Sequence, residues 1–282
     1  MKQLVVFLGL LVLAYADPFD NIDWSTIKTR DLVIQPNGKA RVQQRIVGGQ
    51  PADPNQFPYQ GGLIVTTPTQ NYFCGCALIS QNYVLTAAHC LDDATQVQVR
   101  LGAHLINEYE VTQQRFTSTE LLQHPEWNIE TLAYDFGLVR LPTPATITPY
   151  VQIVALPTWS QVDTTFTGDL AYLTGWGITS DLGTAISESL NYLQSTIISN
   201  LACNIGYLGV ILPTHICTSG DGYTGACTGD SGGAVVNTNG TLVGVMSFAL
   251  SYSCEAGWPS GHARVTTALP WLSEVSDAAI NP

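Results

Sequence analysis

The decisive stretch of this chain is Thr228-Gly229-Asp230-Ser231-Gly232-Gly233, read together with Thr86-Ala87-Ala88-His89-Cys90 far upstream. A serine hydroxyl attacks carbonyl carbons poorly unless a base takes its proton and backbone N–H groups face the developing oxyanion. His89 can supply that base, and Gly229, which has no Cβ, can turn its N–H toward the reacting atoms at little steric cost. The two stretches therefore indicate an activated serine nucleophile at Ser231.

A carboxylate begins the apolar run Tyr134-Asp135-Phe136-Gly137-Leu138. An unpaired carboxylate is costly to bury, so Asp135 needs a partner. All three groups are satisfied if His89 donates one ring N–H to Asp135 and accepts the hydroxyl proton of Ser231 at its other nitrogen. The chain order His, Asp, Ser is one of three unrelated orders in which this catalytic triad occurs.

From Ile46 onward the chain consists of short runs rich in Val, Ile, Leu, Tyr and Thr, separated by turn signals such as Asn237-Thr238-Asn239-Gly240. This pattern predicts an all-β fold. We expect a short terminal helix over 268–276, where Leu269, Leu272 and Val275 have helical spacing. The uncharged segment 143–157 is the candidate linker between two β halves. The candidate strands are 61–66, 83–86, 97–101, 136–141, 171–175, 209–211 and 241–247.

The first residues predict secretion. Lys2, an apolar run and Ala14-Tyr15-Ala16 have the form of a signal peptide, expected over 1–16. The apolar run is too short to span a membrane, and no later run is long enough, so we expect a secreted, extracellular protein with no membrane partner. Residues 17–45 are polar and free of cysteine, which indicates a propeptide before the domain at 46–282.

Charge and residue spacing exclude several classes of ligand. The formal net charge is −12 and no lysine follows Lys39, so a nucleic-acid partner is not expected. The acidity favours solubility, and the scarcity of lysine would also limit attack by trypsin-like enzymes. The remaining histidines lack metal-ligand spacing, so neither a cofactor nor a metal is expected, and they are interpreted as surface or structural residues: His104, His124, His215 and His262.

Four motifs together resemble the chymotrypsin family: Ile46-Val47-Gly48-Gly49, the His89 stretch, Gly175-Trp176-Gly177 and Gly229 to Gly233. The resemblance covers nearly everything from Ile46 onward. It implies two antiparallel six-stranded Greek-key β-barrels, at about 46–150 and about 158–267, and a terminal helix at about 268–277. It also implies that Ser231 is the nucleophile, His89 the general base and then acid, and Asp135 the group that orients the imidazole, with backbone N–H groups of Gly229 and Ser231 forming the oxyanion hole.

The same resemblance implies activation by cleavage. A trypsin-like activating protease would cut Arg45-Ile46, and the new ammonium group of Ile46 would pair with Asp230 and shape the oxyanion loop. Because the propeptide contains no cysteine, we expect it not to remain tethered after the cut. A calcium site is not expected, since Ala103 stands where calcium-binding relatives place an acidic residue.

By resemblance the primary substrate pocket is formed by Gly225, Ala249 and Ser260, none of which is charged. Without a carboxylate to pair with Lys or Arg, the pocket favours medium apolar residues or aromatics, with a smaller, elastase-like preference as the alternative. The segment 254–259 resembles the brachyurin branch of crustacean and insect digestive enzymes. In that branch the residue after Pro259 is often aspartate, so Ser260 departs from its pattern.

The resemblance also implies three disulfides among the seven cysteines: Cys74 to Cys90, Cys203 to Cys217, and Cys227 to Cys254. Cys76 is left over and is interpreted as a buried, unreactive thiol. An exchange in which Cys76 bonds Cys90 is the alternative, because Cys74 and Cys76 point the same way on a strand. Asn239-Gly240-Thr241 is a glycosylation sequon whose occupancy the sequence leaves open.

The leading hypothesis is a secreted, zymogen-activated digestive serine endopeptidase that acts as a monomer on protein or peptide substrates. The alternative is a catalytically silent protease homologue that acts as a binding protein, although such proteins usually lack a triad residue. A regulatory cascade protease is the third hypothesis, and it would normally carry a cysteine-rich or binding domain before the cleavage site.

Overall fold

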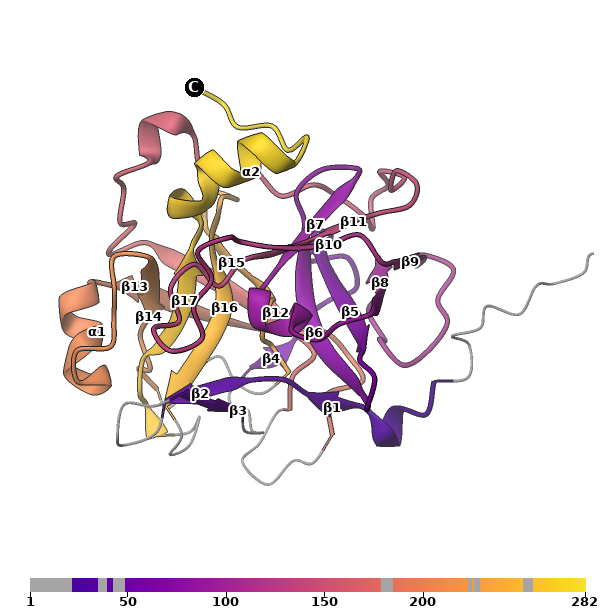
Figure 1. The fold of residues 1–282 in the computed structure, drawn as a ribbon, viewed down its shortest axis with the longest axis horizontal. Helices are drawn as coiled ribbons and strands as arrows, with labels where there is room; N and C mark the ends of the chain where they lie inside the picture. Colours follow the sequence, from indigo (N-terminus) through magenta and orange to yellow (C-terminus); the bar gives the residue numbers. More distant parts are fainter. Residues whose placement is uncertain are drawn as a thin grey trace, which may run out of the picture.

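The computed structural model describes residues 22–34, 40–42, 49–178, 185–222, 225, 229–250 and 256–282. These residues form two barrel-like β-sheets that lie side by side, with a short helix near the C-terminus (Figure 1). The predicted all-β, two-barrel fold is confirmed. Within the described ranges, no helix has the length and apolar character needed to cross a membrane.

The first barrel is built from the strands β5 to β11, which follow one another along the chain. In the sheet they lie side by side in the order β10-β11-β7-β6-β5-β8-β9. Only Thr119 and Glu120 separate β9 from β10, so the two ends of the sheet are joined by a nearly continuous strand. Alternate apolar side chains such as Leu63, Val65 and Val99 face the core. The strands are β5 (Gln60–Thr66), β6 (Asn71–Leu78), β7 (Tyr83–Thr86), β8 (Gln96–Leu101), β9 (Gln114–Ser118), β10 (Leu121–Gln123) and β11 (Gly137–Arg140).

The second barrel has six strands in the order β15-β12-β13-β14-β17-β16, and pairing of β15 with β16 closes it. All of these pairs are antiparallel. A short strand, β4 (Gln50–Pro51), adds to β13 from outside. The six strands are β12 (Leu170–Gly175), β13 (Asn191–Ile198), β14 (His215–Thr218), β15 (Ala234–Asn237), β16 (Leu242–Leu250) and β17 (Ser260–Arg264).

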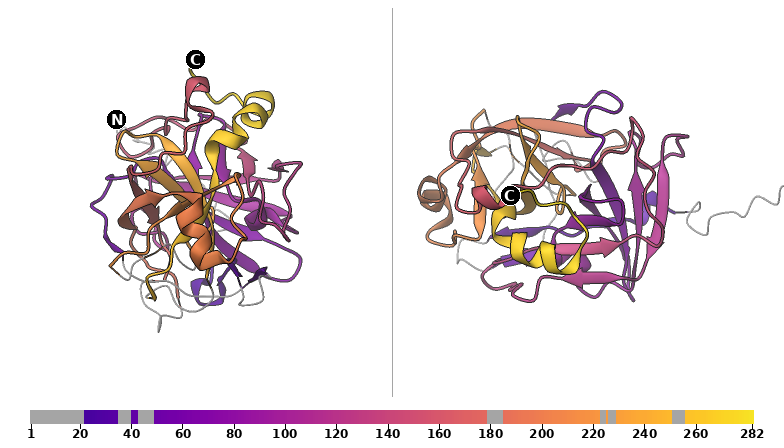
Figure 2. Two further views of the ribbon diagram at one scale, coloured as in Figure 1. Left: turned by 90° about the vertical axis from the view of Figure 1, so that its left-hand side faces the viewer. Right: turned by 90° about the horizontal axis from the view of Figure 1, so that it is seen from above.

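Two α-helices lie outside the barrels (Figure 2). The predicted terminal helix is α2 (Leu269–Val275), which buries Trp271 and Leu272 in the largest hydrophobic core. Short 3-10 turns are η1 (Trp24–Thr26), η2 (Ala88–Leu91), η3 (Trp159–Gln161) and η5 (Val265–Ala268). The other α-helix, α1 (Asn200–Tyr207), was not predicted.

The strand predicted at 209–211 is wrong, since those residues follow α1 as irregular chain. Ser199 caps the helix by accepting the N–H of Ala202 at 3.2 Å, and the left-handed Leu208 and Gly209, with φ of +92°, turn the chain out of it. Leu201 and Ile205 remain exposed, so the helix lacks the usual apolar face pattern.

The two barrels meet through a close approach of backbone. The N–H of Gly75 on β6 donates to the carbonyl oxygen of Ser231 at 2.8 Å. A Cβ on Gly75 would lie 2.7 Å from the Cα of Gly233, a distance that real Cβ atoms do not reach. Glycine at this contact therefore lets the loop of Ser231 rest directly on the first barrel.

Residues 22–34, called the N-terminal segment below, cross from one barrel to the other. Strand β1 (Lys28–Thr29) pairs in parallel with β6, and β2 (Leu32–Ile34) pairs in parallel with β16. Strand β3 (Ala40–Val42) then pairs with β2. Figure 1 shows this indigo segment running along one side of the molecule beneath both barrels.

Candidate active site

His89 lies in η2, directly after β7, in a turn that is held from two sides. The disulfide Cys74–Cys90 joins this turn to β6, and the side-chain amide of Gln123 donates to the carbonyl oxygen of Ala88 at 2.8 Å. The side chain of His89 is almost entirely buried. Its position is thus fixed by covalent and hydrogen-bonded contacts rather than by a free loop.

Asp135 lies just before β11 and is fully buried against His89. Its Oδ2 lies 2.7 Å from Nδ1 of His89, and its Oδ1 accepts the backbone N–H of the same residue at 2.9 Å. The hydroxyl of Ser247 donates to Oδ2 at 2.5 Å. Burial alone would raise the pKa of Asp135, but the charge of His89 and these hydrogen bonds outweigh it and hold the pKa below its usual value.

Both ring nitrogens of His89 face hydrogen-bond acceptors. Nδ1 faces the ionised carboxylate of Asp135, and Nε2 lies 3.0 Å from the carbonyl oxygen of Arg30, which can only accept. Burial lowers the pKa of His89, but the charge and hydrogen bond of Asp135, together with the charge of Asp31, more than compensate and raise it. These contacts therefore favour the protonated form of His89.

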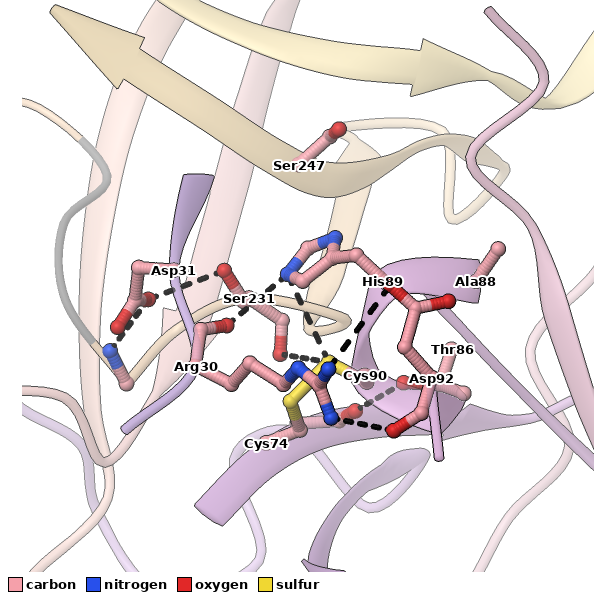
Figure 3. The surroundings of a disulfide bond; sticks show 12 residues. Arg30, Asp31, Cys74, Thr86, Ala88, His89, Cys90, Asp92, Ser231 and Ser247 are labelled. Carbon is pink, nitrogen blue, oxygen red and sulfur yellow. Dashed lines mark hydrogen bonds and ion pairs between the residues drawn. A yellow bond between two sulfur atoms is a disulfide. The ribbon is translucent and has the colours of Figure 1, made fainter. Parts of the chain in front are cut away.

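Ser231 is buried at the junction of the barrels, and its hydroxyl donates to Oδ1 of Asp31 at 3.0 Å. The backbone N–H of Gly229, with φ of +89°, points at the same oxygen from 2.8 Å. Within the described residues no hydrogen bond joins the Ser231 hydroxyl to His89, because Asp31 and Arg30 hold the two groups separately (Figure 3). The structure thus brings the three predicted triad residues together but places the N-terminal segment between two of them.

Asp230, the predicted activation residue, accepts the backbone N–H of Gly177 at 3.0 Å through Oδ1. Gly175 makes room for this carboxylate, since a Cβ there would lie 2.1 Å from Oδ1. Arg45 and Ile46 lie outside the described residues. The predicted ion pair between Ile46 and Asp230 therefore stays a prediction.

The three predicted pocket residues lie on the second barrel. Ser260 begins β17 and is buried, Ala249 is half-buried near the end of β16, and Gly225 is buried beside undescribed neighbours. Strand β2 covers this wall, with Val33 in register with Ala249.

Two of the predicted disulfides, Cys74–Cys90 and Cys203–Cys217, are present in the structure. Cys227 and Cys254 lie outside the described residues. Cys76 is a buried free cysteine, and burial raises the pKa of its thiol far above the usual range. Asn239 of the sequon is exposed in the turn between β15 and β16, and its glycosylation stays a prediction.

The other histidines have structural surroundings. Nε2 of His215 hydrogen-bonds the carbonyl oxygen of Leu132 at 2.8 Å, and Nε2 of His262 lies 2.9 Å from the hydroxyl of Thr218. Burial lowers the pKa of His262 to about 3, so it stays neutral. Across the described ranges no three His, Cys, Asp or Glu side chains gather where they could hold a metal ion.

Three residues at the site were missed by sequence reasoning. Ser247 supports Asp135, while Arg30 and Asp31 occupy the space in front of His89 and Ser231. Ser247 precedes the predicted pocket residue Ala249 in the sequence, and that position could have indicated that Ser247 lies near the site. Nothing in the sequence linked Asp31 to Ser231, because 200 positions separate them.

Comparison with known proteins agrees with this geometry. A family model described as Trypsin matches residues 46–272. The chain is 40% identical over 227 residues to brachyurin of Leptuca pugilator, a match that covers 80% of this chain and 96% of that protein. It is 33% identical over 279 residues to chymotrypsin of Phaedon cochleariae, covering 98% of this chain and 99% of the relative.

The fold also matches a solved structure of HL collagenase with a TM-score of 0.75 and 33% identity, covering 81% of this chain and 97% of that chain. The resemblance to the chymotrypsin family, with brachyurin among the similar proteins, is confirmed. The chain belongs to the trypsin family and is a serine protease with the chymotrypsin fold.

Proposed function

We propose that this protein is a secreted serine endopeptidase, made as a zymogen, in which Ser231, His89 and Asp135 form the catalytic triad. The observation that carries the proposal is the position of one carboxylate oxygen of Asp31. It lies within hydrogen-bond distance of both the Gly229 N–H and the Ser231 hydroxyl, beside the His89 imidazolium. A negatively charged oxygen in this place marks where the oxyanion of an acyl-transfer intermediate would be stabilised.

The mechanism follows from these contacts once a substrate replaces Asp31. Neutral His89 takes the proton of Ser231 as its oxygen attacks the scissile carbonyl, and the Gly229 N–H stabilises the resulting oxyanion. Asp135 stays ionised, because the contacts with His89 and Ser247 hold its pKa low, and it stabilises the imidazolium. His89 then protonates the leaving amine, and water hydrolyses the acyl-enzyme by the same steps in reverse.

Activation is proposed to require cleavage of Arg45-Ile46, after which the new ammonium group pairs with Asp230. The carboxylate of Asp230 already contacts the backbone of Gly177, in the loop that follows β12. Asp230 also directly precedes Ser231 in the sequence. A new ion pair at Asp230 would therefore act directly on the oxyanion loop.

Activation is tested by labelling Ser231. The full chain is treated with immobilised trypsin, and the trypsin and the cleaved propeptide are then removed, the latter by gel filtration. The product is incubated with a fluorophosphonate and mapped by mass spectrometry. We expect label on Ser231 after the cut and none in Arg45→Gln, which keeps the bond intact. Equal labelling of Arg45→Gln would refute zymogen activation, and an unlabelled cut enzyme would favour a silent binding protein.

We propose that the enzyme is digestive and cleaves after uncharged residues, as the resemblance of its sequence to the chymotrypsin family implies. Gly225, Ala249 and Ser260 place no charge on the pocket wall. A peptide library digested by the activated enzyme should be cleaved mainly after medium apolar or aromatic residues. Predominant cleavage after Lys or Arg would contradict the neutral pocket, while cleavage after Ala or Val would favour the elastase-like alternative.

The catalytically silent alternative gains no support from the structure. Silent homologues usually lack a triad residue, and here His89 and Asp135 are paired at 2.7 Å next to Ser231.

A further inference from the structure

The N-terminal segment makes its most specific contacts with the catalytic groups themselves. Through Oδ1, Asp31 accepts from the Gly229 N–H and from the Ser231 hydroxyl, and the carbonyl oxygen of Arg30 accepts from Nε2 of His89. Figure 3 shows Arg30 and Asp31, the two residues between β1 and β2, beside Ser231 and His89. Two consecutive residues of the segment thus engage the base, the nucleophile and an oxyanion donor.

These contacts leave the site unable to react. The hydroxyl of Ser231 points its proton at Asp31 and away from His89, and Nε2 of His89, which would have to accept that proton, is engaged with the carbonyl oxygen of Arg30. The group that lies at Ser231 is a side-chain carboxylate and not a peptide carbonyl. An ionised carboxylate is a poor electrophile and has no amine leaving group, so Asp31 occupies the site without being cleaved.

Side chains on both sides of Asp31 anchor the segment. On the first barrel, Trp24 packs near Phe73, with ring centroids 6.4 Å apart, and the guanidinium of Arg100 lies 5.1 Å from the Trp24 ring. On the second barrel, Leu32 and Ile34 are buried in the cluster that contains Phe248. Burial of such apolar surface favours the docked position of the segment.

Arg30 supplies a charged anchor between these apolar ones. Its guanidinium lies 4.0 Å from the carboxylates of Asp92 and Asp93, donates to the carbonyl oxygen of Asp92, and stacks 5.1 Å from the ring of Tyr72. Main-chain pairing of β1 with β6 and of β2 with β16 completes the attachment. The segment is therefore held as an added strand on each barrel.

We propose that the N-terminal segment is a built-in inhibitor that fills the catalytic cleft with an extended peptide, and that its Asp31 carboxylate takes the place of the substrate oxyanion. All of these contacts come from residues before Arg45, and none needs the Arg45-Ile46 bond. Cleavage there leaves them intact, so release of the segment is a second step of activation. The cleft should accordingly bind the detached segment in trans as a reversible, competitive inhibitor.

The test uses a synthetic peptide of residues 22–34 and the activated enzyme, prepared from the full chain with immobilised trypsin and freed of its own segment by gel filtration. We expect competitive inhibition of a small chromogenic substrate, with the peptide intact by mass spectrometry. Asp31→Ala should weaken inhibition roughly tenfold or more, because it removes the oxygen that accepts from the Gly229 N–H and the Ser231 hydroxyl. Asp23→Asn is the matched control, since it removes an exposed carboxylate and still caps η1, and it should leave inhibition unchanged.

Inhibition absent at 1 mM peptide, or equal inhibition by the Asp31→Ala and parent peptides, would overturn the proposal, and so would cleavage of the peptide at Asp31. The inference rests on the proposed protease activity, but the two fail differently. An activated enzyme with no turnover and no fluorophosphonate label refutes the proposed function, whereas an active enzyme that ignores the peptide refutes only the inhibitor.

The pH dependence of binding gives a second readout. Burial raises the pKa of Asp31 from 3.8 to about 6. The Gly229 N–H, the His89 charge and the Ser231 hydroxyl lower this pKa, but burial outweighs them. The pKa of His89 is also raised. The charged groups that face this pair are Asp135 and Asp92. Because burial in the complex favours the protonated form of Asp31, affinity is full below pH 3.8 and falls as pH rises through about 6.

Calorimetry should therefore show tighter binding of the parent peptide at pH 5 than at pH 8. The Asp31→Asn peptide has no titrating carboxylate at this position, so its affinity ratio between the two pH values should be smaller. Identical ratios for the two peptides would contradict a titrating carboxylate at the oxyanion site.

Discussion

Asp135→Asn is expected to lower kcat/KM about 10⁴-fold, the loss that the same substitution causes in a serine protease of this family. Asparagine can still accept the backbone N–H of His89, which lies 2.9 Å from Oδ1, so the fold should survive. Its amide, however, would donate to Nδ1 of His89 in place of the carboxylate. The neutral imidazole would then carry its proton on Nε2 and could not accept one from Ser231.

The loss should be measured on the activated enzyme, with thermal unfolding as a check on the fold. Ser247→Ala is the comparison variant, because it removes one hydrogen bond to Oδ2 of Asp135 but leaves the carboxylate in place. We expect it to cost roughly tenfold, in keeping with one hydrogen bond to a charged group. An Asp135→Asn enzyme within tenfold of the parent would show that another group sets the tautomer of His89.

Gly232→Ala is expected to destabilise the protein by about 3 kcal/mol or more, or to prevent folding. Gly232 has φ of +81°, and an alanine Cβ would lie 2.2 Å from Oγ1 of Thr86 and 2.5 Å from the carbonyl oxygen of Gly75. The left-handed conformation costs a non-glycine residue roughly 1–2 kcal/mol, and overpacking against fixed backbone costs about 1–3 kcal/mol more. Both barrels would have to shift, because Gly75 lies on β6 and Gly232 adjoins Ser231.

Gly240→Ala separates these two costs. Gly240 has φ of +83°, nearly that of Gly232, but a Cβ there would meet no atom within 4 Å. It should therefore cost only the strain of roughly 1–2 kcal/mol. Urea unfolding of the uncut chain measures both variants, and equal losses would show that the contact between the barrels is less tightly packed than the structure indicates.

The sequence predicted those strands that carry regular turn signals and β-branched runs, such as β5, β7 and β8. It did not predict β6, whose residues Asn71–Leu78 include a glycine and two cysteines that weaken any strand pattern. Helix α1 was missed for a related reason. Its buried residues are Cys203 and Tyr207, while Leu201 and Ile205 face outward, so burial does not follow hydrophobicity.

At the site, the pairing of His89 with Asp135 could be predicted because a buried carboxylate needs a partner. The position of Asp31 beside Ser231 could not be predicted, since it depends on contacts between residues far apart in the sequence. The N-terminal segment appeared polar, yet Leu32 and Ile34 are enough to bury it on the second barrel. Tertiary packing, and not local composition, decides where this segment lies.

The parallel addition of β1 to β6 and β2 to β16 also bears on what the enzyme can digest. When the segment leaves, it uncovers main-chain donors and acceptors that only an extended chain can satisfy. Compact proteins offer few such stretches, because their backbone is already paired internally. Heat- or acid-denatured proteins should therefore be degraded much faster than the same proteins in their native state.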